Sequence, residues 1–505
     1  MAAVTTAATA EKDGAYKVLV LITMACACML YALTLTIVNV ALPQMQGAFS
    51  ATTEEISWVV TLNVVATAVV TPLTGSLVAW FGQRRLLILC LSGFTFASLA
   101  CAMATSLEAV LFFRIIQGAF GAPVVPLSQA IVLQVWPKEE YGKANGYLGM
   151  SVVIGPAIGP SIGGWLAEEY NWRFVFLMIV PFSLLALAGV MRWIREGGKT
   201  ALPRFDYLGF LLFSVAIVAL QLVLDRGERE DWLQSGTIVA LLIVMCAAFA
   251  MFVANSACVD RPFVRPVLLK NQNFVVGLFL VFVYGAVNFT PLVLLPQLLQ
   301  SYRGYPDTLI GLVLAMRGVG MIAGFFVAAR MGKMDPRIGL VLGTLAIGTS
   351  GWMMSLYDLN VGFWALVWPS ILQGIGCGLM WVPLSMVSFS TLDRALLPDA
   401  TSLFHLIRNM GTSLYVAASV FVLVRTSKVR YAEMVEGVGP FDERLKFPEV
   451  VGSGGVQWMD SLGLIAGEAW RQSALIGFSN CFLLYALTCF ATLPVLVFVK
   501  IRRTD

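Results

Sequence analysis

The chain has 505 residues, of which 59% are hydrophobic and 12% are charged, and its formal net charge is +4. Soluble domains carry about 25% charged residues, so this composition excludes an ordinary soluble protein and indicates a polytopic membrane protein. The small net charge gives no support for nucleic-acid binding. The 9 cysteines lack the spacing of a metal site or a disulfide framework, and we expect no cofactor and no metal.

Membrane-length apolar runs follow one another along the whole chain. A helix needs about 20 apolar residues to cross the hydrocarbon core. The first run follows a polar segment, residues 1–14, and is too long for the core of a signal peptide. We predict an all-α fold with fourteen spans, so that both termini lie on one side of the membrane. The spans are placed at residues 17–42, 57–79, 86–105, 109–134, 145–167, 173–193, 207–224, 236–256, 274–298, 308–329, 338–357, 362–388, 401–424 and 477–499.

Lysine and arginine are distributed unevenly between the two sets of loops. The loops on the side of the termini carry many, including Arg84, Arg85, Arg192, Arg195, Arg330 and Arg337. The opposite short loops carry few, among them Arg173, Arg226 and Arg229. Because positively charged loops stay in the cytoplasm, we expect cytoplasmic termini in a cell inner (plasma) membrane. Residues 425–476 would then form a long periplasmic loop, whose mixed composition suggests a folded extension.

The two ends of the chain repeat the same short motifs. Ile116-Gln117-Gly118 recurs as Leu372-Gln373-Gly374, and a Pro-Gln pair ends both the first and the ninth run. We therefore predict an N-terminal six-helix bundle at 15–195, an inserted transmembrane pair at 206–257, and a C-terminal six-helix bundle at 272–500. Transporters built from such repeats bind their substrates near the membrane midplane, at the interface of the two halves.

Ionisable side chains inside the runs are candidates for a substrate or proton pathway, since each costs about 2.5–3.5 kcal/mol at bilayer depth. They are Arg114, Arg317, Arg408 and His405, and the same predicted pathway includes the polar residues Thr34, Asn39, Gln117, Gln373 and Asn409. No carboxylate accompanies them inside the runs. Each arginine has an alternative role in hydrogen bonding to backbone carbonyls, and the histidine is either a proton carrier or a packing residue.

Residues 155–164 read Gly-Pro-Ala-Ile-Gly-Pro-Ser-Ile-Gly-Gly. Glycines four residues apart give a helix a flat face for close contact, and prolines remove backbone donors and bend the helix. We treat this segment as a candidate gating motif, with a simple tight-packing face as the alternative. Its residues are Gly155, Pro156, Gly159, Pro160, Gly163 and Gly164.

These stretches, in this order, resemble the major facilitator superfamily, in particular its fourteen-helix drug:proton antiporter branch of EmrB- and QacA-type multidrug exporters. The resemblance covers essentially the whole chain. It is carried by residues 35–43, 112–118, 155–164, 171–173, 224–227, 294–300 and 408–411. It implies that residues 155–164 are the antiporter motif, that Arg114 lies in the central pathway, and that Gly75, Gly82, Arg84 and Arg85 belong to a cytoplasmic loop that latches the inner gate. The alternative for that loop is positive charge that only sets topology.

Two positions depart from the family pattern. Thr34 stands where the family usually has an aspartate that carries protons, and a hydroxyl cannot titrate near neutral pH. Ala79 stands where the cytoplasmic loop usually has an aspartate. Asn39 keeps its match, and we expect it to form hydrogen bonds within its bundle. His405 and Asp225 remain as candidate proton carriers, although Asp225 is also expected to pair with its neighbour Arg226.

We therefore expect a secondary active exporter of amphipathic organic compounds, including drugs, weak acids and fatty-acid or lipid-like molecules, driven by the proton gradient. The alternative is a proton-independent anion or lipid exchanger or flippase of the same fold. A cavity with arginines and no acid should favour anions over cations. The resemblance also implies a periplasmic adaptor (EmrA-like) and an outer-membrane channel as partners, with residues 425–476 as the docking element. One histidine without an intramembrane acid argues against an enzyme.

Overall fold

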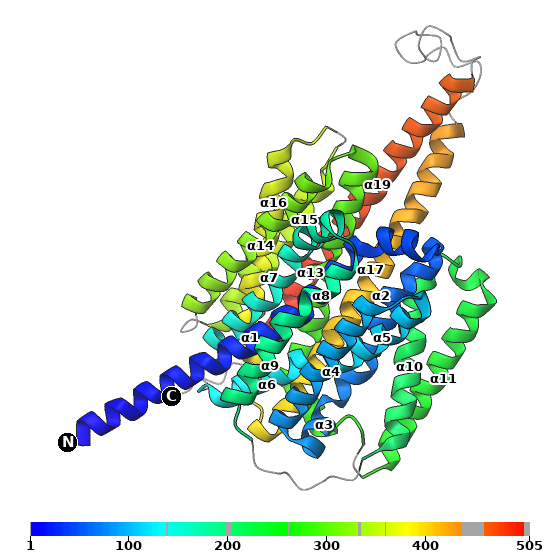
Figure 1. Ribbon diagram of the computed structural model, residues 1–505. Helices are drawn as coiled ribbons and strands as arrows, with labels where there is room; N and C mark the ends of the chain where they lie inside the picture. The colour runs from blue at the N-terminus through cyan, green and yellow to red at the C-terminus, as the bar shows by residue number, and fades with distance from the viewer. Residues whose placement is uncertain are drawn as a thin grey trace.

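The computed structural model describes residues 2–137, 140–196, 205–260, 262–331, 335–358, 360–436 and 459–498. Within these ranges the regular structure is entirely helical (Figure 1). Thirteen helices of the described part are long and apolar enough to cross a membrane. A further helix, α7 (Tyr141–Glu169), covers the predicted fifth span. The predicted all-α membrane fold is therefore confirmed.

The first half of the chain forms a bundle in which the second and fourth spans are each interrupted near a proline. Pro72 lies in the short 3-10 helix of the second span, and Pro123 precedes the second piece of the fourth. Proline lacks the backbone N–H that would continue the helix, which explains both interruptions. The elements are α1 (Ala2–Phe49), α2 (Thr53–Val70), η1 (Thr71–Leu73), α3 (Thr74–Phe81), α4 (Gln83–Met103), α5 (Leu107–Gly121), α6 (Val124–Val135), α7, α8 (Arg173–Leu177) and α9 (Ile179–Trp193).

The second half contains longer, mostly unbroken helices. They are α13 (Gln272–Arg303), α14 (Asp307–Arg330), α15 (Pro336–Ser355), α16 (Phe363–Phe389), η5 (Arg394–Leu396), α17 (Leu397–Glu436), α19 (Met459–Thr492) and η7 (Leu493–Phe498). Helix α1 packs along α7 as α13 packs along α17, and α2 packs along α5 as α14 packs along α16. The same pairing in both halves is what two copies of one bundle would produce.

An inserted helical pair lies at one edge of the molecule (Figure 1). It consists of α10 (Tyr207–Arg226) and α11 (Gly236–Cys258), joined through η3 (Trp232–Gln234), and α12 (Pro266–Leu269) leads on to the second half. Helix α10 contacts α2 of the first half and α17 of the second. Phe213 and Ile217 of α10 pack in one apolar cluster with Ala68 of α2 and Leu406 of α17. The inserted pair therefore covers the seam between the halves at this edge.

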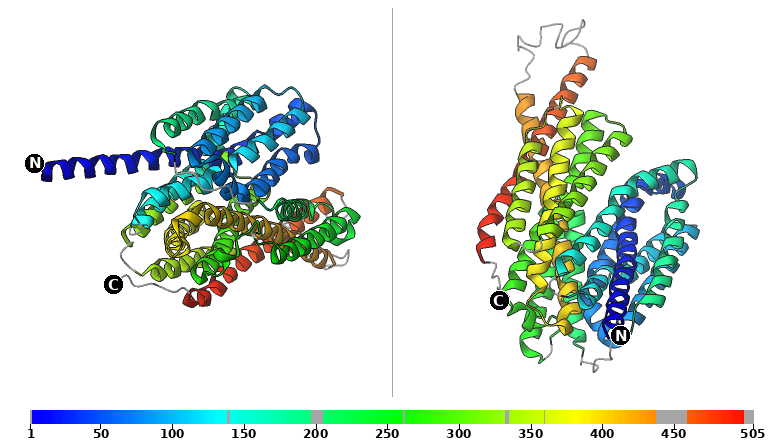
Figure 2. Two further views of the ribbon diagram at one scale, coloured as in Figure 1. Left: turned by 90° about the horizontal axis from the view of Figure 1, so that it is seen from below. Right: turned by 90° about the vertical axis from the view of Figure 1, so that its left-hand side faces the viewer.

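Two helices project beyond the bundle at the end opposite the start of α1 (Figures 1 and 2). Helix α17 continues to Glu436 and α19 begins at Met459, so residues 425–436 and 459–476, which we expected in a loop, are helical. The rings of Tyr431 and Trp470 pack at 5.7 Å between centroids, which joins the two helices there. Residues 437–458 lie outside the described ranges.

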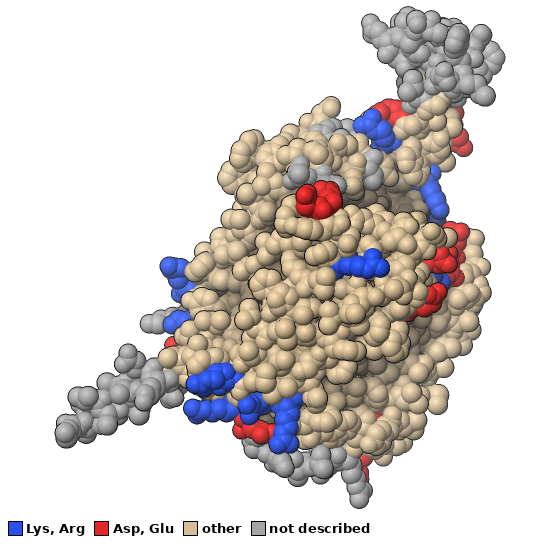
Figure 3. Space-filling view, viewed as in Figure 1, with Lys and Arg blue, Asp and Glu red and all other residues tan. Residues whose placement is uncertain are grey.

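The start of α1 and the end of η7 lie at the same end of the bundle (Figure 2). Lysine and arginine side chains gather on the surface near this end (Figure 3). Gly82, with φ +79°, makes the tight turn between α3 and α4 there, a backbone conformation that favours glycine. The distribution of positive charge agrees with the pattern read from the loops.

Candidate functional site

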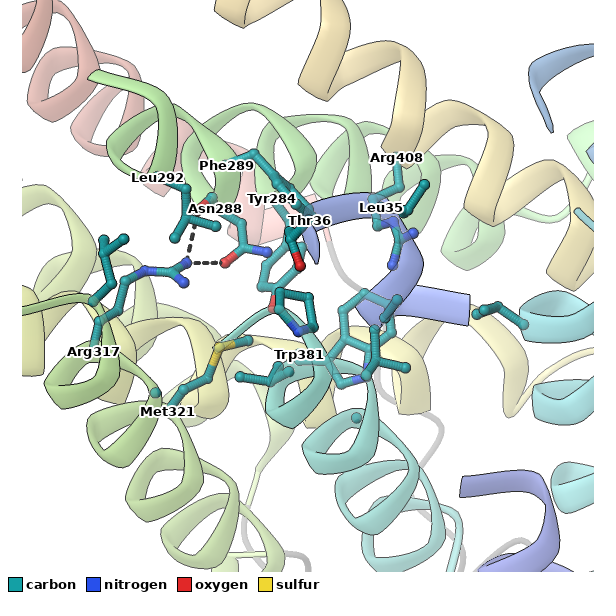
Figure 4. A pocket seen from close by; sticks show the side chains of 18 of the residues that line it. Leu35, Thr36, Tyr284, Asn288, Phe289, Leu292, Arg317, Met321, Trp381 and Arg408 are labelled. Atoms are coloured by element: carbon teal, nitrogen blue, oxygen red, sulfur yellow. Dashed lines mark hydrogen bonds between the residues drawn. The ribbon is translucent and has the colours of Figure 1, made fainter. Parts of the chain in front are cut away.

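A cavity with about 900 Å³ of empty space lies between the two halves of the chain. Helices α1, α6 and α7 line it from the first half, and α13, α14, α16 and α17 line it from the second. Most of the wall is apolar, including Leu35, Phe289, Leu292 and Met321 (Figure 4).

Two charged residues line the described part of the wall, and both are arginines: Arg317 and Arg408. Among the described residues that line the cavity there is no aspartate, glutamate or histidine. Because opposite charges attract and no acid lies beside the two arginines in this lining, the electrostatics of the wall are better matched to an anionic group than to a cationic one. In the part of the chain that the structure describes, no three His, Cys, Asp or Glu side chains gather in a way that would hold a metal ion.

Arg317 is buried and ties three helices of the second half together. Its Nη2 donates to the carbonyl oxygen of Asn288 at 2.7 Å and also to the Oδ1 of that residue, and its Nε donates to Oε1 of Gln373. Gln373 in turn donates through Nε2 to the carbonyl of Val287 at 3.3 Å. Of the two predicted pathway residues, Arg317 lines the cavity and Gln373 is bonded to it behind the wall, while Asn288 is a partner that the sequence did not indicate.

Arg408 is half-buried on α17, and its guanidinium faces the cavity (Figure 4). Its Nη2 and Nε lie 3.1 Å and 3.4 Å from Oδ1 of the adjacent Asn409. Its guanidinium carbon lies 5.9 Å from the ring centroid of Trp381, close enough for a cation–π interaction. The predicted pair Arg408 and Asn409 thus provides a charge at the cavity with one neighbouring acceptor.

His405 forms a polar bridge between the halves. Its Nε2 lies 2.7 Å from Oε1 of Gln129 on α6, and Gln129 donates through Nε2 to Oδ1 of Asn145 on α7 at 3.0 Å. All three side chains are buried, and the histidine ring packs against Trp381 and Phe404. Because the amide oxygen of Gln129 accepts, the ring nitrogen Nε2 carries the proton in this arrangement. His405 itself is not among the residues that line the cavity.

The hydrogen bond between His405 and Gln129 can be used to test the equilibrium between two arrangements of the halves. Replacing Gln129 with leucine removes the acceptor of His405 and should disfavour the observed arrangement by about 1–3 kcal/mol, the usual cost of an unsatisfied buried polar group. We expect the population to shift toward the alternative arrangement of the halves. Distances between spin labels on the exposed positions of Glu169 and Leu356, in a background with Cys246 and Cys258 changed to serine, would report this shift.

A matched control is available within the first half. Gln83 donates to Oε1 of Gln134 at 2.9 Å, so Gln134→Leu removes an amide contact without touching the seam between the halves. This control should leave the distance distribution unchanged. An unchanged distribution in the Gln129→Leu protein as well would show that the bridge does not hold the halves together.

The structure places Arg114 and Gln117 inside the first half, away from the cavity wall. Arg114 is buried and donates through Nε to the carbonyl of Val59 at 2.9 Å and through Nη1 to Gln117 Oε1 at 2.6 Å. Gln117 donates to Ser98 Oγ at 2.8 Å, and Asn63 donates to the Arg114 carbonyl at 2.9 Å. These contacts join α5 to α2 and α4, which is the structural role that we held as the alternative.

Thr34 and Asn39 lie on different faces of α1. Thr34 is buried and donates its hydroxyl to the carbonyl of Leu30 at 2.9 Å, while its neighbours Leu35 and Thr36 line the cavity. Asn39 is exposed, one helical turn beyond Leu35 and Thr36 on their face. Among the described residues no hydrogen bond to its side chain is seen, in contrast to our expectation.

The glycines of residues 155–164 pack α7 closely against α1. A Cβ added at Gly155 would lie 2.6 Å from the Met29 carbonyl oxygen, and one at Gly159 would lie 2.7 Å from Thr36 Oγ1. Gly163 similarly faces Ile37, whereas Gly164 has ordinary space, 3.6 Å from Val40. The prolines do not interrupt α7, which is helical throughout.

The other side of α7 faces the second half of the chain. Pro156 lines the cavity, and a Cβ at Gly149 would meet Phe325 of α14 and Trp381 of α16. The side chain of Pro160 lies outside those described. Helix α7 therefore lies between α1 and the opposing half, which is where a gating element would have to lie.

The predicted latch residues contact the second half at one point. Gly75 lies against Asp399 of α17 with no space for a Cβ, and Asp399 pairs with Arg265 at 3.1 Å. Arg84 donates to the Met191 carbonyl at 2.8 Å, and Arg85 pairs with Glu196 at 2.6 Å. Both arginines thus contact the first half, and Asp399, which the sequence did not indicate, brings a carboxylate to the loop.

Asp225 has a different partner from the one we expected. It accepts a hydrogen bond from the hydroxyl of Thr61 on α2. Arg226 instead pairs with Glu54 at 2.9 Å and with Glu230 at 3.4 Å. This group lies at the end of α10, on the side of the molecule opposite the start of α1.

A membrane bundle of two similarly paired halves with a cavity between them is the architecture of a secondary transporter. The chain belongs to the Major Facilitator Superfamily, whose family model matches residues 24–260 and 277–438. It is thus a transporter of this family and not an enzyme. The resemblance read from the sequence motifs is confirmed.

Proteins similar to this chain along nearly its whole length include two bacterial resistance proteins. The multidrug export protein EmrB of Escherichia coli (strain K12) is 29% identical over 493 residues, covering 97% of this chain and 96% of that protein. The fatty acid resistance protein FarB of Neisseria gonorrhoeae is 29% identical over 493 residues, covering 96% and 97%.

Solved structures show the same fold. The human organic anion transporter MFSD10 superimposes with a TM-score of 0.61 at 13% identity, covering 94% of this chain and 99% of that one. The proton:xylose symporter XylE gives 0.60 at 15% identity, covering 95% and 97%.

Proposed function

We propose that this protein is a secondary active exporter that moves amphipathic organic compounds, above all weak acids and fatty-acid or lipid-like anions, out of the cell through an inner (plasma) membrane. One observation carries this proposal: the cavity between the halves is mostly apolar, contains Arg317 and Arg408, and has no carboxylate among its described lining residues. The apolar wall suits a hydrocarbon portion, and the two cations suit an anionic group.

The two similar resistance proteins support the same substrate class. The name of EmrB describes export of several drugs, and that of FarB describes resistance to fatty acids. Fatty acids have an apolar chain and one carboxylate, which are the two chemical features that the cavity wall would accommodate. Drugs with an acidic group share both features.

The arrangement of the halves supports transport by alternating access. Contacts across the seam occur at the end where α1 starts, where Gly142 faces Met386, Gly149 faces Phe325, and Gly75 faces Asp399. Positive charge at that end supports a cytoplasmic location for both termini. We therefore take the observed conformation as one that is closed toward the cytoplasm.

Export is proposed to draw on the proton gradient, with His405 and Asp225 as candidate carriers. The alternative is a proton-independent anion or lipid exchanger, which is favoured by Thr34 at the position of the usual aspartate. Transport measured with and without an imposed pH gradient separates the two. Strict dependence on the gradient would exclude the exchanger, and unchanged rates without a gradient would exclude proton coupling.

The α17–α19 extension is the proposed docking element for a periplasmic adaptor that would lead to an outer-membrane channel. The extension projects from the end that we assign to the periplasm (Figure 1), and its surface carries exposed Val429, Val435 and Trp470. Similarity to EmrB supports this part of the proposal. Loss of adaptor binding after Val429→Glu and Val435→Glu, with transport in liposomes retained, is the expected result.

The substrate class is tested with purified protein in liposomes. Two fluorescent amphiphiles of equal chain length are compared, one with a sulfonate and one with a trimethylammonium group, because both stay charged and cross bilayers slowly unaided. We expect the sulfonate to be transported at least about tenfold faster, a difference that corresponds to about 1.4 kcal/mol. Efficient transport of the cation together with neglect of the anion would disprove the substrate assignment.

A further inference from the structure

The two arginines of the cavity differ in how many of their donors are already used. The guanidinium of Arg317 is bound through Nε to Gln373 and through Nη2 to both oxygens of Asn288. Arg408 has a single acceptor, Asn409 Oδ1, which its Nε and Nη2 share at 3.4 Å and 3.1 Å. A guanidinium carries five N–H donors. Among the described residues neither arginine donates to an oxygen through Nη1, but Nη2 of Arg317 is held by two oxygens of Asn288, whereas Nη2 of Arg408 meets one oxygen at 3.1 Å. The Nη1–Nη2 edge of Arg408 is therefore the more available to a ligand.

The surroundings of Arg408 complete a site for an anion attached to a hydrocarbon chain. Its guanidinium lies beside the Trp381 ring, near Leu35 of α1, and on the far side of the cavity from Arg317 in the view of Figure 4. A cation–π contact at this distance leaves the Nη1–Nη2 edge of the guanidinium free for a bidentate contact with a carboxylate or sulfonate. The apolar wall between the two arginines would receive the chain.

We propose that Arg408 is the residue that binds the anionic group of the substrate, and that Arg317 is a structural residue of the cavity wall. The assignment rests on the proposed export of amphipathic anions and specifies where they bind. It also places the substrate charge one helical turn from His405, whose side chain bridges to Gln129 of the other half. An anion on Arg408 would therefore lie next to a contact that must change when the halves move.

The test is equilibrium binding to the purified full chain in nanodiscs of zwitterionic lipid, measured by titration calorimetry. The probes are a pyrene-labelled alkyl sulfonate and the pyrene-labelled alcohol of the same chain length. Arg408→Gln should weaken sulfonate binding by about 10- to 100-fold, as expected for loss of a charge-assisted contact, and should change alcohol binding by less than about threefold. Arg408→Lys should retain part of the preference for the sulfonate, because the charge remains but the bidentate geometry is lost.

Arg317→Gln is the matched variant in the same wall. Because Asn288 and Gln373 would lose their partner, it should lower the melting temperature and weaken the binding of both probes alike. The proposal is overturned if Arg408→Gln affects the two probes equally, or if Arg317→Gln alone removes the preference for the sulfonate. If Arg408→Gln does not fold, the test is the ratio of sulfonate to alcohol binding in Arg408→Lys. An unchanged ratio in that variant would contradict a bidentate contact.

The binding result separates this inference from the proposed export activity. Selective binding through Arg408 without transport in liposomes would contradict the export function and leave the site assignment standing. Transport of the sulfonate that is insensitive to Arg408→Gln would contradict the site and leave the export function standing.

Discussion

Replacing Gly155 with valine is expected to abolish export and to lower the melting temperature of the purified protein. A Cβ at this position would lie 2.6 Å from the Met29 carbonyl oxygen and 2.8 Å from the Leu33 backbone nitrogen. Both are backbone atoms of α1, so the clash is relieved only if α1 and α7 move apart along their contact. Forced insertion of carbon atoms into a well-packed interface typically costs about 1–3 kcal/mol.

The neighbouring Gly164 provides the control for this prediction. A Cβ there meets only Val40 Cγ1, at 3.6 Å, so Gly164→Val adds the same atoms to the same helix without a backbone clash. Melting curves and liposome transport of the two variants are compared with the parent. Equal behaviour of both variants would show that close contact between α1 and α7 is not required for transport.

Arg114→Leu is the second substitution with a large expected effect, and the effect is on stability. It would remove the donors to Val59 and Gln117 from a fully buried position and leave these acceptors unsatisfied. Hydrogen bonds from charged groups contribute about 1.5–3 kcal/mol each, so yield and melting temperature should fall markedly. The folded fraction should keep its preference for anions, because Arg114 does not line the cavity.

Arg430→Leu serves as the reference for loss of an arginine. Arg430 is exposed and pairs with Glu433 at 2.7 Å, a contact for which we expect at most about 1 kcal/mol. Melting temperature and the ratio of sulfonate to alcohol binding are measured for both variants. If the Arg114→Leu protein is stable but has lost its preference for anions, the result would support the role of Arg114 in the central pathway that the family resemblance implied.

The sequence was sufficient for the fold, because the fold depends on apolar patterning that persists along the chain, whereas only two of the predicted pathway residues line the cavity. Apolar runs of membrane length determine the spans, and Arg317 and Arg408 stand out in them as charges. The helical extension beyond residue 425 was not predicted, because its charged residues resemble those of a loop once the helix has left the membrane. Hydropathy alone does not mark where such a helix ends.

The sequence could not show which intramembrane arginine faces the cavity. Arg114 and Arg408 are alike as charges within apolar runs, and only the rotation of each helix in the assembled bundle separates them. The partners Gln129 and Asp399 were missed for a related reason. Each meets its partner across the seam between the halves, and the pairing depends on positions far apart in the chain.

The apolar cluster at the edge of the seam has a consequence for the energy needed to move the halves. Phe213 and Ile217 of the inserted pair contact Ala68 in one half and Leu406 in the other. In water, separating such side chains would expose them at considerable cost, but acyl chains are as apolar as the side chains themselves. When the seam opens at this edge, lipid can replace the lost contacts almost without a hydrophobic penalty. The bilayer thus lowers the energy needed to separate the halves at this edge. Most of the energy barrier between the inward-closed conformation and the alternative arrangement of the halves then comes from the polar contacts in the interior.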